Sequence, residues 1–247
     1  MLWKLVVAPL VCAPLALPQG STLPSRETLN YNLEWRLITA GKARVDWSAK
    51  PQSTPGWQIH FHLESVGIVS KLFRVEDDYT ALLNPSLCVE TAQMTTHEGS
   101  RQRETKITFD AVSKKSAYLE RDRVRNITVM AHEIDIPACV HDVIGGLYFL
   151  RTLTIEPGQS VEVPVSDGKK SVMAKVALAA QREDVRMPEG IVKTFRYDLY
   201  LFNQVLYNRS GHLSVWLTDD RRKLPAQIQV RLPFTIGTIT LHLAGYE

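Results

Sequence analysis

The sequence has no marked excess of charge of one sign and, beyond its first twenty residues, no long hydrophobic run. Its 29 Lys and Arg residues nearly balance its 26 Asp and Glu residues, which leaves a formal net charge of +3. Duplex nucleic acid is bound by a concentrated basic stripe, so this balance argues against a nucleic-acid-binding protein. A membrane-spanning helix needs about 20 apolar residues, and we expect no transmembrane span once the leader described below is removed.

Catalytic signatures are missing as well. The sequence has no G-x-S-x-G elbow, P-loop or dinucleotide-binding fingerprint, and none of its seven histidines has the spacing of a zinc-binding motif. We therefore expect no catalytic residue, no metal and no other cofactor, and favour a non-enzymatic protein. A hydrolase that uses His132 or His141 with a neighbouring acid is a remote alternative, because adjacent side chains point in different directions.

The first twenty residues have the pattern of a secretory signal peptide. Lys4 precedes an uncharged apolar stretch, residues 5–17, which is shorter than a membrane span and is interrupted by Pro9 and Pro14. Residues 1–20 are therefore expected to direct export and to be removed. Residues 21–247 then form the mature protein, which we expect to be one β-rich domain.

Cysteine is scarce, with three residues in the whole chain. Cys12 lies in the leader, so the mature protein keeps two, Cys88 and Cys139. In an oxidising compartment such a pair indicates a disulfide. Two buried free thiols are the alternative.

What the sequence does have is the alternating pattern of β-strands. In residues 29–37, Leu29, Tyr31, Leu33, Trp35 and Leu37 alternate with polar residues. Ala40-Gly41-Lys42 is typical of a turn, and alternating segments follow at 43–47 and 57–63. Residues 66–73 break the pattern as a short helical turn or irregular crossing, and alternation then continues to residue 243. We predict about eleven strands in antiparallel arrangement.

One segment, residues 139–153, has the period of a helix. Its apolar residues recur mostly at intervals of three and four: Val140, Val143, Ile144, Leu147, Tyr148 and Leu150. Gly145 and Gly146 would weaken an exposed helix, so they indicate a helix that packs closely against a neighbour.

A large sheet must cover its apolar face, and one helix cannot cover a flat one. We therefore predict a mainly β fold, in which a large curved antiparallel sheet, a half-barrel or open barrel, wraps around one main helix. Such a fold can enclose an apolar pocket for a lipid, and a fully packed core is the alternative. The expected lining is Tyr31, Trp35, Phe61, Ile144, Leu147 and Tyr148.

Polar residues gather at two places. One is the segment 216–225, which has the pattern of a strand end, an acidic turn and a basic triplet. Its main residues are Trp216, Asp219, Asp220, Arg221 and Pro225. It is either a hairpin whose carboxylates accept turn N–H groups or a surface that binds a headgroup or a protein. Asp142 near the start of the helix and Arg151 near its end match the helix dipole.

The densest basic alternation is Arg121, Arg123 and Arg125. On a strand these residues would line one face. They predict either a cationic patch for anionic headgroups or a solvated face of the sheet.

These residues together resemble a family of exported bacterial proteins, domain of unknown function 3108. The resemblance covers essentially the whole mature chain and is carried by the following residues: Leu29, Tyr31, Trp35, Gly41, Ala43, Asp78-Tyr79-Thr80, His141-Asp142-Val143, Leu147-Tyr148-Phe149-Leu150-Arg151, Gly158, Trp216-Leu217-Thr218-Asp219-Asp220-Arg221-Arg222 and Leu224-Pro225.

The resemblance implies a location and an architecture but no reaction. It places the protein in the periplasm or at the outer-membrane periphery of a bacterium. Family members are similar in architecture to the lipoprotein carriers LolA and LolB, in which a curved sheet wraps helices and holds acyl chains; this chain has one clear helix where the carriers have several. We therefore expect a lipid or a lipoprotein acyl chain as ligand. A structural or interaction module that docks on an envelope protein partner, with no ligand, is the alternative.

Overall fold

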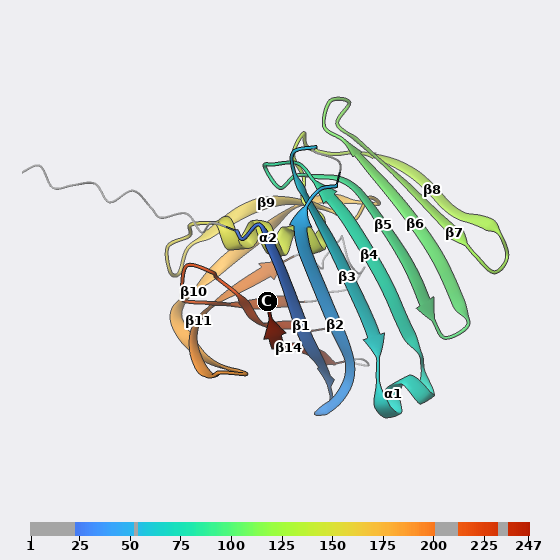
Figure 1. Ribbon diagram of the computed structural model, residues 1–247. Helices are drawn as coiled ribbons and strands as arrows, with labels where there is room; N and C mark the ends of the chain where they lie inside the picture. Colours follow the sequence, from blue (N-terminus) through green and yellow to red (C-terminus); the bar gives the residue numbers. More distant parts are fainter. Residues whose placement is uncertain (1–22, 52–53, 201–211, 232–236) are drawn as a thin grey trace, which may run out of the picture.

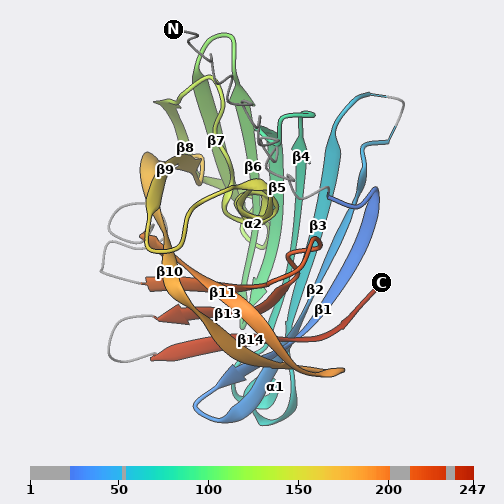
Figure 2. The same cartoon turned by 90° about the vertical axis from the view of Figure 1, so that its left-hand side faces the viewer.

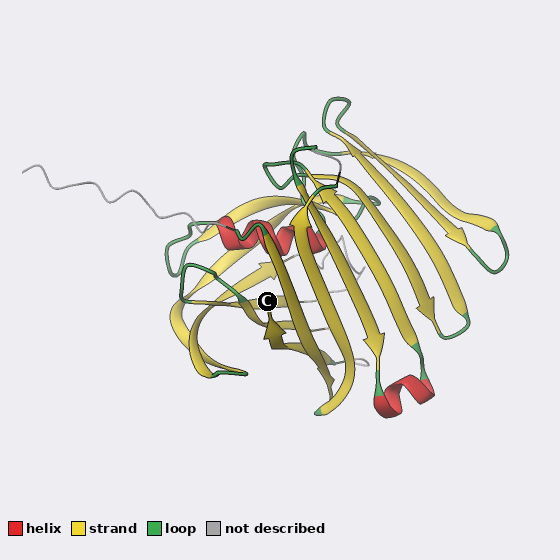
Figure 3. Ribbon diagram, viewed as in Figure 1, coloured by secondary structure: helices red, strands yellow, loops and turns green. Residues whose placement is uncertain are grey.

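The computed structural model describes residues 23–51, 54–200, 212–231 and 237–247. The expected signal peptide, residues 1–20, lies outside the described residues. Most of the described chain is β-strand, and two helices accompany the strands (Figure 3).

Fourteen strands form one sheet in which every neighbouring pair is antiparallel (Figure 1). The strands are β1 (Arg26–Trp35), β2 (Ile38–Ala49), β3 (Trp57–Ser65), β4 (Val75–Leu83), β5 (Val89–Glu98), β6 (Arg101–Asp110), β7 (Lys115–Asp122), β8 (Ile127–Asp135), β9 (Ser160–Ser166), β10 (Ser171–Met187), β11 (Gly190–Tyr200), β12 (His212–Thr218), β13 (Pro225–Arg231) and β14 (Thr238–Tyr246). Their order across the sheet is β8-β7-β6-β5-β4-β3-β2-β1-β14-β13-β12-β11-β10-β9, so β1 pairs with β14 and the sheet ends at β8 and β9 without closing.

The predicted number of about eleven strands is therefore too low. Several strands are separated by only two residues, such as Gly99-Ser100 between β5 and β6 and Pro188-Glu189 between β10 and β11. A two-residue hairpin turn leaves almost no gap between strands, so a given length of chain holds more strands than the estimate of about eleven allowed. The prediction of a large, mainly antiparallel and open sheet is confirmed.

The first hairpin turn lies earlier than predicted. It is made by Arg36 and Leu37, with φ values of 50° and 67°, a left-handed conformation that costs energy in residues other than glycine. Arg36 and Leu37 are not residues typical of such a turn, so the sequence does not indicate a turn here. Gly41, which suggested one, lies inside β2, where a Cβ atom would come within 2.6 Å of the Glu64 carbonyl oxygen; the glycine permits β2 to approach β3.

The structure has two helices, α1 (Gly67–Leu72) and α2 (Val143–Thr152), where one main helix was expected. Helix α1 is one short exposed segment between β3 and β4, at the site of the predicted helical turn. Helix α2 is shorter than the predicted 139–153, because the chain before Asp142 is extended and pairs with β9 through His141. In the described residues neither helix is long and apolar enough to cross a membrane.

The sheet curves around α2 (Figure 2), which contacts β3 on one side and β9 on the other. The buried apolar residues accordingly form two clusters. One contains Tyr148 of α2 and residues of β1–β7, including Trp47; the other contains Leu150 of α2 and residues of β9–β12. Gly145 allows α2 to lie close to the sheet, because a Cβ there would be 3.2 Å from a methyl carbon of Leu83.

Cys88 and Cys139, the two cysteines of the expected mature chain, are joined by a disulfide across 51 positions of sequence. The bond connects the start of β5 to the segment that leads into α2. We expect residues 21–247, denatured without reductant, to show no free thiol on titration. After reduction the same sample should show two, and two thiols before reduction would contradict the bond.

Candidate ligand-binding site

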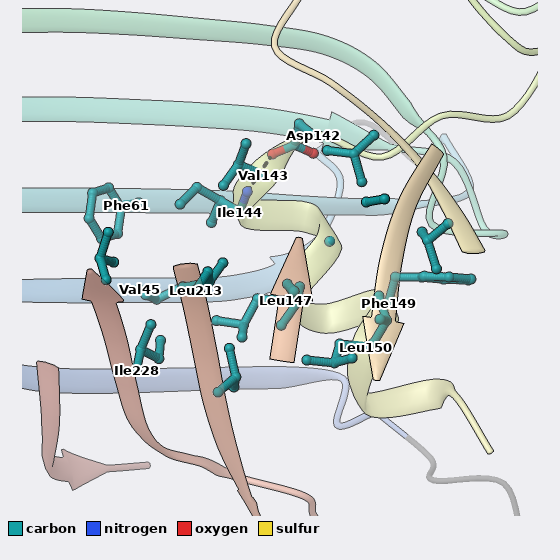
Figure 4. A pocket seen from close by; sticks show the side chains of 18 of the residues that line it. Val45, Phe61, Asp142, Val143, Ile144, Leu147, Phe149, Leu150, Leu213 and Ile228 are labelled. Atoms are coloured by element: carbon teal, nitrogen blue, oxygen red, sulfur yellow. Dashed lines mark hydrogen bonds between the residues drawn. The ribbon is translucent and has the colours of Figure 1, made fainter. Parts of the chain in front are cut away.

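A pocket of about 370 Å³ lies between α2 and the concave face of the sheet (Figure 4). We call it the apolar pocket. Side chains of α2 and of strands on both sides of the helix point into it, among them Ile144, Leu147, Phe61, Leu213 and Ile228. The lining residues with polar groups on their side chains are Asp142 and Tyr31, and the Tyr31 hydroxyl donates a hydrogen bond to the Pro225 carbonyl oxygen at 2.9 Å.

Four of the six predicted lining residues border the apolar pocket, namely Tyr31, Phe61, Ile144 and Leu147. Trp35 does not, because it is the last residue of β1, next to the Arg36-Leu37 turn, and lies beyond the part of the strand that borders the pocket.

Tyr148 does not border the pocket either. It is fully buried, and its ring stacks on Trp47 with 4.2 Å between centroids. It therefore lies on the side of α2 that packs against the sheet.

The remaining lining comes mostly from the C-terminal strands and was not predicted from the sequence. These residues are Val163 and Val165 of β9, Ala174 and Val176 of β10, Leu199 of β11, Leu213 and Val215 of β12, Ile228 and Val230 of β13, and Leu241 of β14. Their alternation along each strand signals that they face inward. That these strands fold back over the far side of α2 is a long-range feature that the alternation cannot reveal.

The N-terminus of α2 is held by Asp142. One carboxylate oxygen, Oδ2, accepts hydrogen bonds from the backbone N–H groups of Ile144 and Gly145, at 3.1 and 2.9 Å, and from the Tyr79 hydroxyl at 2.8 Å. This is an N-cap, joined to β4 by the tyrosine. Burial raises the pKa of Asp142 despite these bonds, and burial with the Asp142 charge also raises the pKa of Tyr79.

The C-terminal end of α2 is held by Arg151, whose side chain is fully buried. Its guanidinium donates to both carboxylate oxygens of Glu27 in β1, at 2.5 and 2.9 Å, and to the backbone oxygen of Arg222 at 2.9 Å. It also lies over the ring of Tyr148, at 5.1 Å from the centroid. Arg151 thus does more than match the helix dipole, because it joins the helix to two distant segments.

The predicted hairpin after β12 uses its polar groups internally. The Trp216 indole N–H donates to the Glu183 carboxylate at 2.7 Å, and the Asp219 carboxylate accepts from Arg182 at 2.6 Å. Both partners lie on β10, so these contacts attach the start of the hairpin to the neighbouring part of the sheet.

The turn of the hairpin has the structural role that its acidic residues suggested. Asp220 accepts from the backbone N–H groups of Arg222 and Lys223 and pairs with the Arg222 side chain at 3.1 Å. The Lys223 ammonium donates to the Leu153 carbonyl oxygen at the end of α2, at 2.7 Å. Arg221 is exposed. The hairpin therefore packs against the C-terminal end of the helix.

A second pocket of about 340 Å³ adjoins the first at the N-terminus of α2. We call it the polar pocket. It shares Phe61, Asp142, Val143 and Ile144 with the apolar pocket. Its other lining residues include the polar side chains of Asp77, Gln93, Thr105, Tyr118, Ser166, Asp167 and Lys169. The two pockets together offer an apolar space continued by one in which polar side chains stand among a largely apolar lining.

Asp77 in the polar pocket gives the protein a pH-dependent stability. Burial, and secondarily the nearby Glu98 charge, raises its pKa to about 6. Because the folded pKa lies above the unfolded one, ionised Asp77 lowers stability above about pH 6, and this cost disappears as the pH falls toward the ordinary value near 4.

Asp77→Asn is therefore expected to raise the free energy of unfolding at pH 8 by about 1–2 kcal/mol. This is less than the full equivalent of the pKa shift, because Asp77 is partly exposed and solvent screens its charge. Denaturant unfolding at several pH values measures the effect, which should shrink toward zero at pH 4. Glu104→Gln on the solvated side of β6 is the control. A gain of equal size at both pH values would contradict this account of Asp77.

The histidines of the remote hydrolase alternative lie in ordinary structural surroundings. The His141 ring is buried, its Nδ1 lies 2.8 Å from the Leu87 carbonyl oxygen, and it stacks on Phe149 at 3.9 Å. Burial lowers the pKa of His141, which favours the neutral ring. His132 lies on the exposed strand β8. Neither ring borders the two pockets.

Comparisons with known proteins concern the family and the fold. The model of the family described as "Protein of unknown function (DUF3108)" matches residues 30–244. A crystal structure of a β-barrel-like protein of domain of unknown function DUF1849 from Brucella abortus aligns with a TM-score of 0.58 at 7% identity, over 92% of this chain and 98% of that one. A DUF1089 family protein from Pseudomonas aeruginosa aligns with a TM-score of 0.35 at 11% identity, over 87% of this chain and 95% of that one.

No curated protein matches the sequence. The first of the two structures supports a β-barrel-like fold, and the second is too dissimilar to add to it. The likeness to LolA and LolB stays a prediction.

Proposed function

The chain belongs to the DUF3108 family, as its motifs indicated, and we propose from its site that it is a non-enzymatic envelope protein that binds a lipid or lipoprotein acyl chain between the curved sheet and α2. The observation that carries this proposal is the apolar pocket. Its volume of about 370 Å³ falls in the range of about 300–1,000 Å³ typical of small-molecule sites.

An acyl chain suits this lining better than a polar ligand. Among the residues that line the pocket, those with polar groups on their side chains are Asp142, which caps α2, and Tyr31, whose hydroxyl already has an acceptor. A polar group placed elsewhere in it would lose its bonds to water without replacement. Each methylene moved from water into such a lining contributes about 0.8 kcal/mol. An unbranched chain gains most from a lining made of Val, Leu, Ile and Phe.

The adjoining polar pocket extends the proposal to an amphiphile. Asp142, Val143 and Ile144 border both pockets, so one molecule can pass the N-terminus of α2. Its chain would occupy the apolar pocket, and its polar end would lie among side chains such as Gln93, Thr105 and Lys169.

Export to the periplasm or the outer-membrane periphery is part of the proposal. It is supported by the leader pattern of residues 1–20 and by the Cys88–Cys139 disulfide. Stable disulfides belong to oxidising compartments such as the bacterial periplasm.

Native mass spectrometry of protein purified from a bacterial periplasm tests the proposal. We expect a bound lipid that is released on denaturation, and displacement of a fluorescent fatty acid by unlabelled acyl chains in solution. Absence of a copurifying lipid together with absence of fatty-acid binding would refute it.

A further inference from the structure

The two edges of the open sheet differ in how they are protected. At the β9 edge the chain before α2 lies alongside the strand: the His141 backbone N–H donates to Pro164 at 3.0 Å, and the Ser166 N–H donates to the His141 carbonyl oxygen at 2.9 Å. Pro164 itself has no N–H to offer a further strand. The C-terminal end of this edge is therefore covered.

The β8 edge has none of these protections. In the described part of the chain, β8 pairs with β7 on one side and with no strand on the other. Every residue of β8 except Ile134 is exposed, including Ile127 at 49%, Val129 at 42% and Met130 at 42%. The strand is nine residues long and contains no proline or lysine, and its pairing with β7 is regular apart from one register shift at Val129. Natural sheets seldom leave a long apolar edge free, because it is a template for another strand.

We propose that a second copy of this chain pairs with β8, edge to edge and antiparallel, so that one sheet continues through both copies. The charges flanking β8 are self-complementary. Arg123 and Arg125 precede the strand, whereas Glu133 and Asp135 lie at its end, where the two carboxylates share the single Lys115 of β7 and keep an excess of negative charge; all four residues are exposed. Two-fold antiparallel pairing brings the basic end of each strand beside the acidic end of the other.

This arrangement also explains the basic alternation at 121–125. Arg121 is the last but one residue of β7, whereas Arg123 and Arg125 lie in the turn between β7 and β8, so the three do not form the stripe on one strand face that their spacing suggested. The Arg123 backbone N–H still bonds Gln102 of β6. Arg125 lies two residues before the free strand β8, where an acidic partner end can meet it.

Charge complementation tests the proposal. The unmodified residues 21–247 are expected to sediment as a dimer at low ionic strength. The variant Arg123→Glu/Arg125→Glu makes both ends of β8 acidic, and Glu133→Lys/Asp135→Lys makes both ends basic. Each variant alone should be a monomer, with its dimer dissociation constant raised at least about tenfold. An equimolar mixture should recover a dimer that contains one copy of each.

Two further variants separate edge pairing from misfolding. Val129→Lys introduces the charge that natural edges use against pairing and should give a folded monomer by circular dichroism. Ile191→Lys, at an apolar residue of 66% exposure in β11, should remain a dimer. A monomeric unmodified protein, or a mixture of the two charge variants that stays monomeric, would overturn the proposal.

Discussion

Arg151→Met is expected to lower the free energy of unfolding by about 3–5 kcal/mol, the typical cost of leaving one partner of a buried ion pair alone. Arg151 is fully buried and bonds both carboxylate oxygens of Glu27. Removing the guanidinium leaves the Glu27 charge without a partner in the core and frees the Arg222 carbonyl oxygen. Chemical denaturation of the variant measures the loss.

A double variant shows whether the loss comes from the unpaired charge. Arg151→Met with Glu27→Leu removes both charges and is expected to recover most of the stability, because well-packed apolar replacements of a buried pair are often neutral. Lys193→Met, which breaks an exposed pair with Asp184, should cost less than about 1 kcal/mol. If Arg151→Met costs no more than Lys193→Met, the proposed attachment of α2 through Arg151 is wrong.

Ala174→Phe is expected to weaken acyl-chain binding by about 10–100-fold, equivalent to roughly 1.4–2.8 kcal/mol. Ala174 is fully buried on β10 and borders the apolar pocket. A phenyl ring at this position would occupy the space that we assign to the ligand. Displacement of a fluorescent fatty acid measures the change in affinity.

Met173→Phe is the matched control for this experiment. Met173 is the preceding residue of the same strand and is 53% exposed, so the same ring is added outside the pocket and binding should not change. Leu147→Trp fills the pocket from the helix side and should reproduce the loss if Ala174→Phe destabilises the sheet. Unchanged affinity in a folded Leu147→Trp variant would argue against this pocket as the site.

The residues that carry the family resemblance converge on the two ends of α2. Tyr79 bonds Asp142 at the N-terminus. At the C-terminal end, Arg151 bonds the backbone of Arg222 in the hairpin, and Tyr31 bonds that of Pro225. These contacts join segments far apart in sequence, and together they fix the helix across the sheet. The motif residues thus position α2, while much of the pocket wall is built from ordinary apolar side chains.

Local features of this fold could be predicted from residue types and their spacing. Alternation identified the strands, the period of three to four identified α2, and the pair of cysteines indicated the disulfide. Glu27 shows the limit of this reasoning, because a charged residue beside Arg26 at the start of β1 is expected to be exposed. It is buried because Arg151, 124 positions away, accompanies it.

The candidate site could be predicted only in part, because local patterns show which way a side chain faces but not which distant segments meet it. Tyr31, Phe61, Ile144 and Leu147 follow from the inward face of a strand or the apolar face of a helix. Trp35 was placed wrongly because alternation assigns a residue to one face of its strand but does not show how far along the strand the pocket extends.

The central claim is that an acyl chain occupies the apolar pocket, and photo-crosslinking with a diazirine-bearing fatty acid tests it most directly. The expected result is label on residues that line this pocket, such as Leu147, Val176 and Leu213, together with its loss in Ala174→Phe and its retention in Met173→Phe. Label confined to the outer surface of the sheet, or equal label in both variants, would contradict the claim.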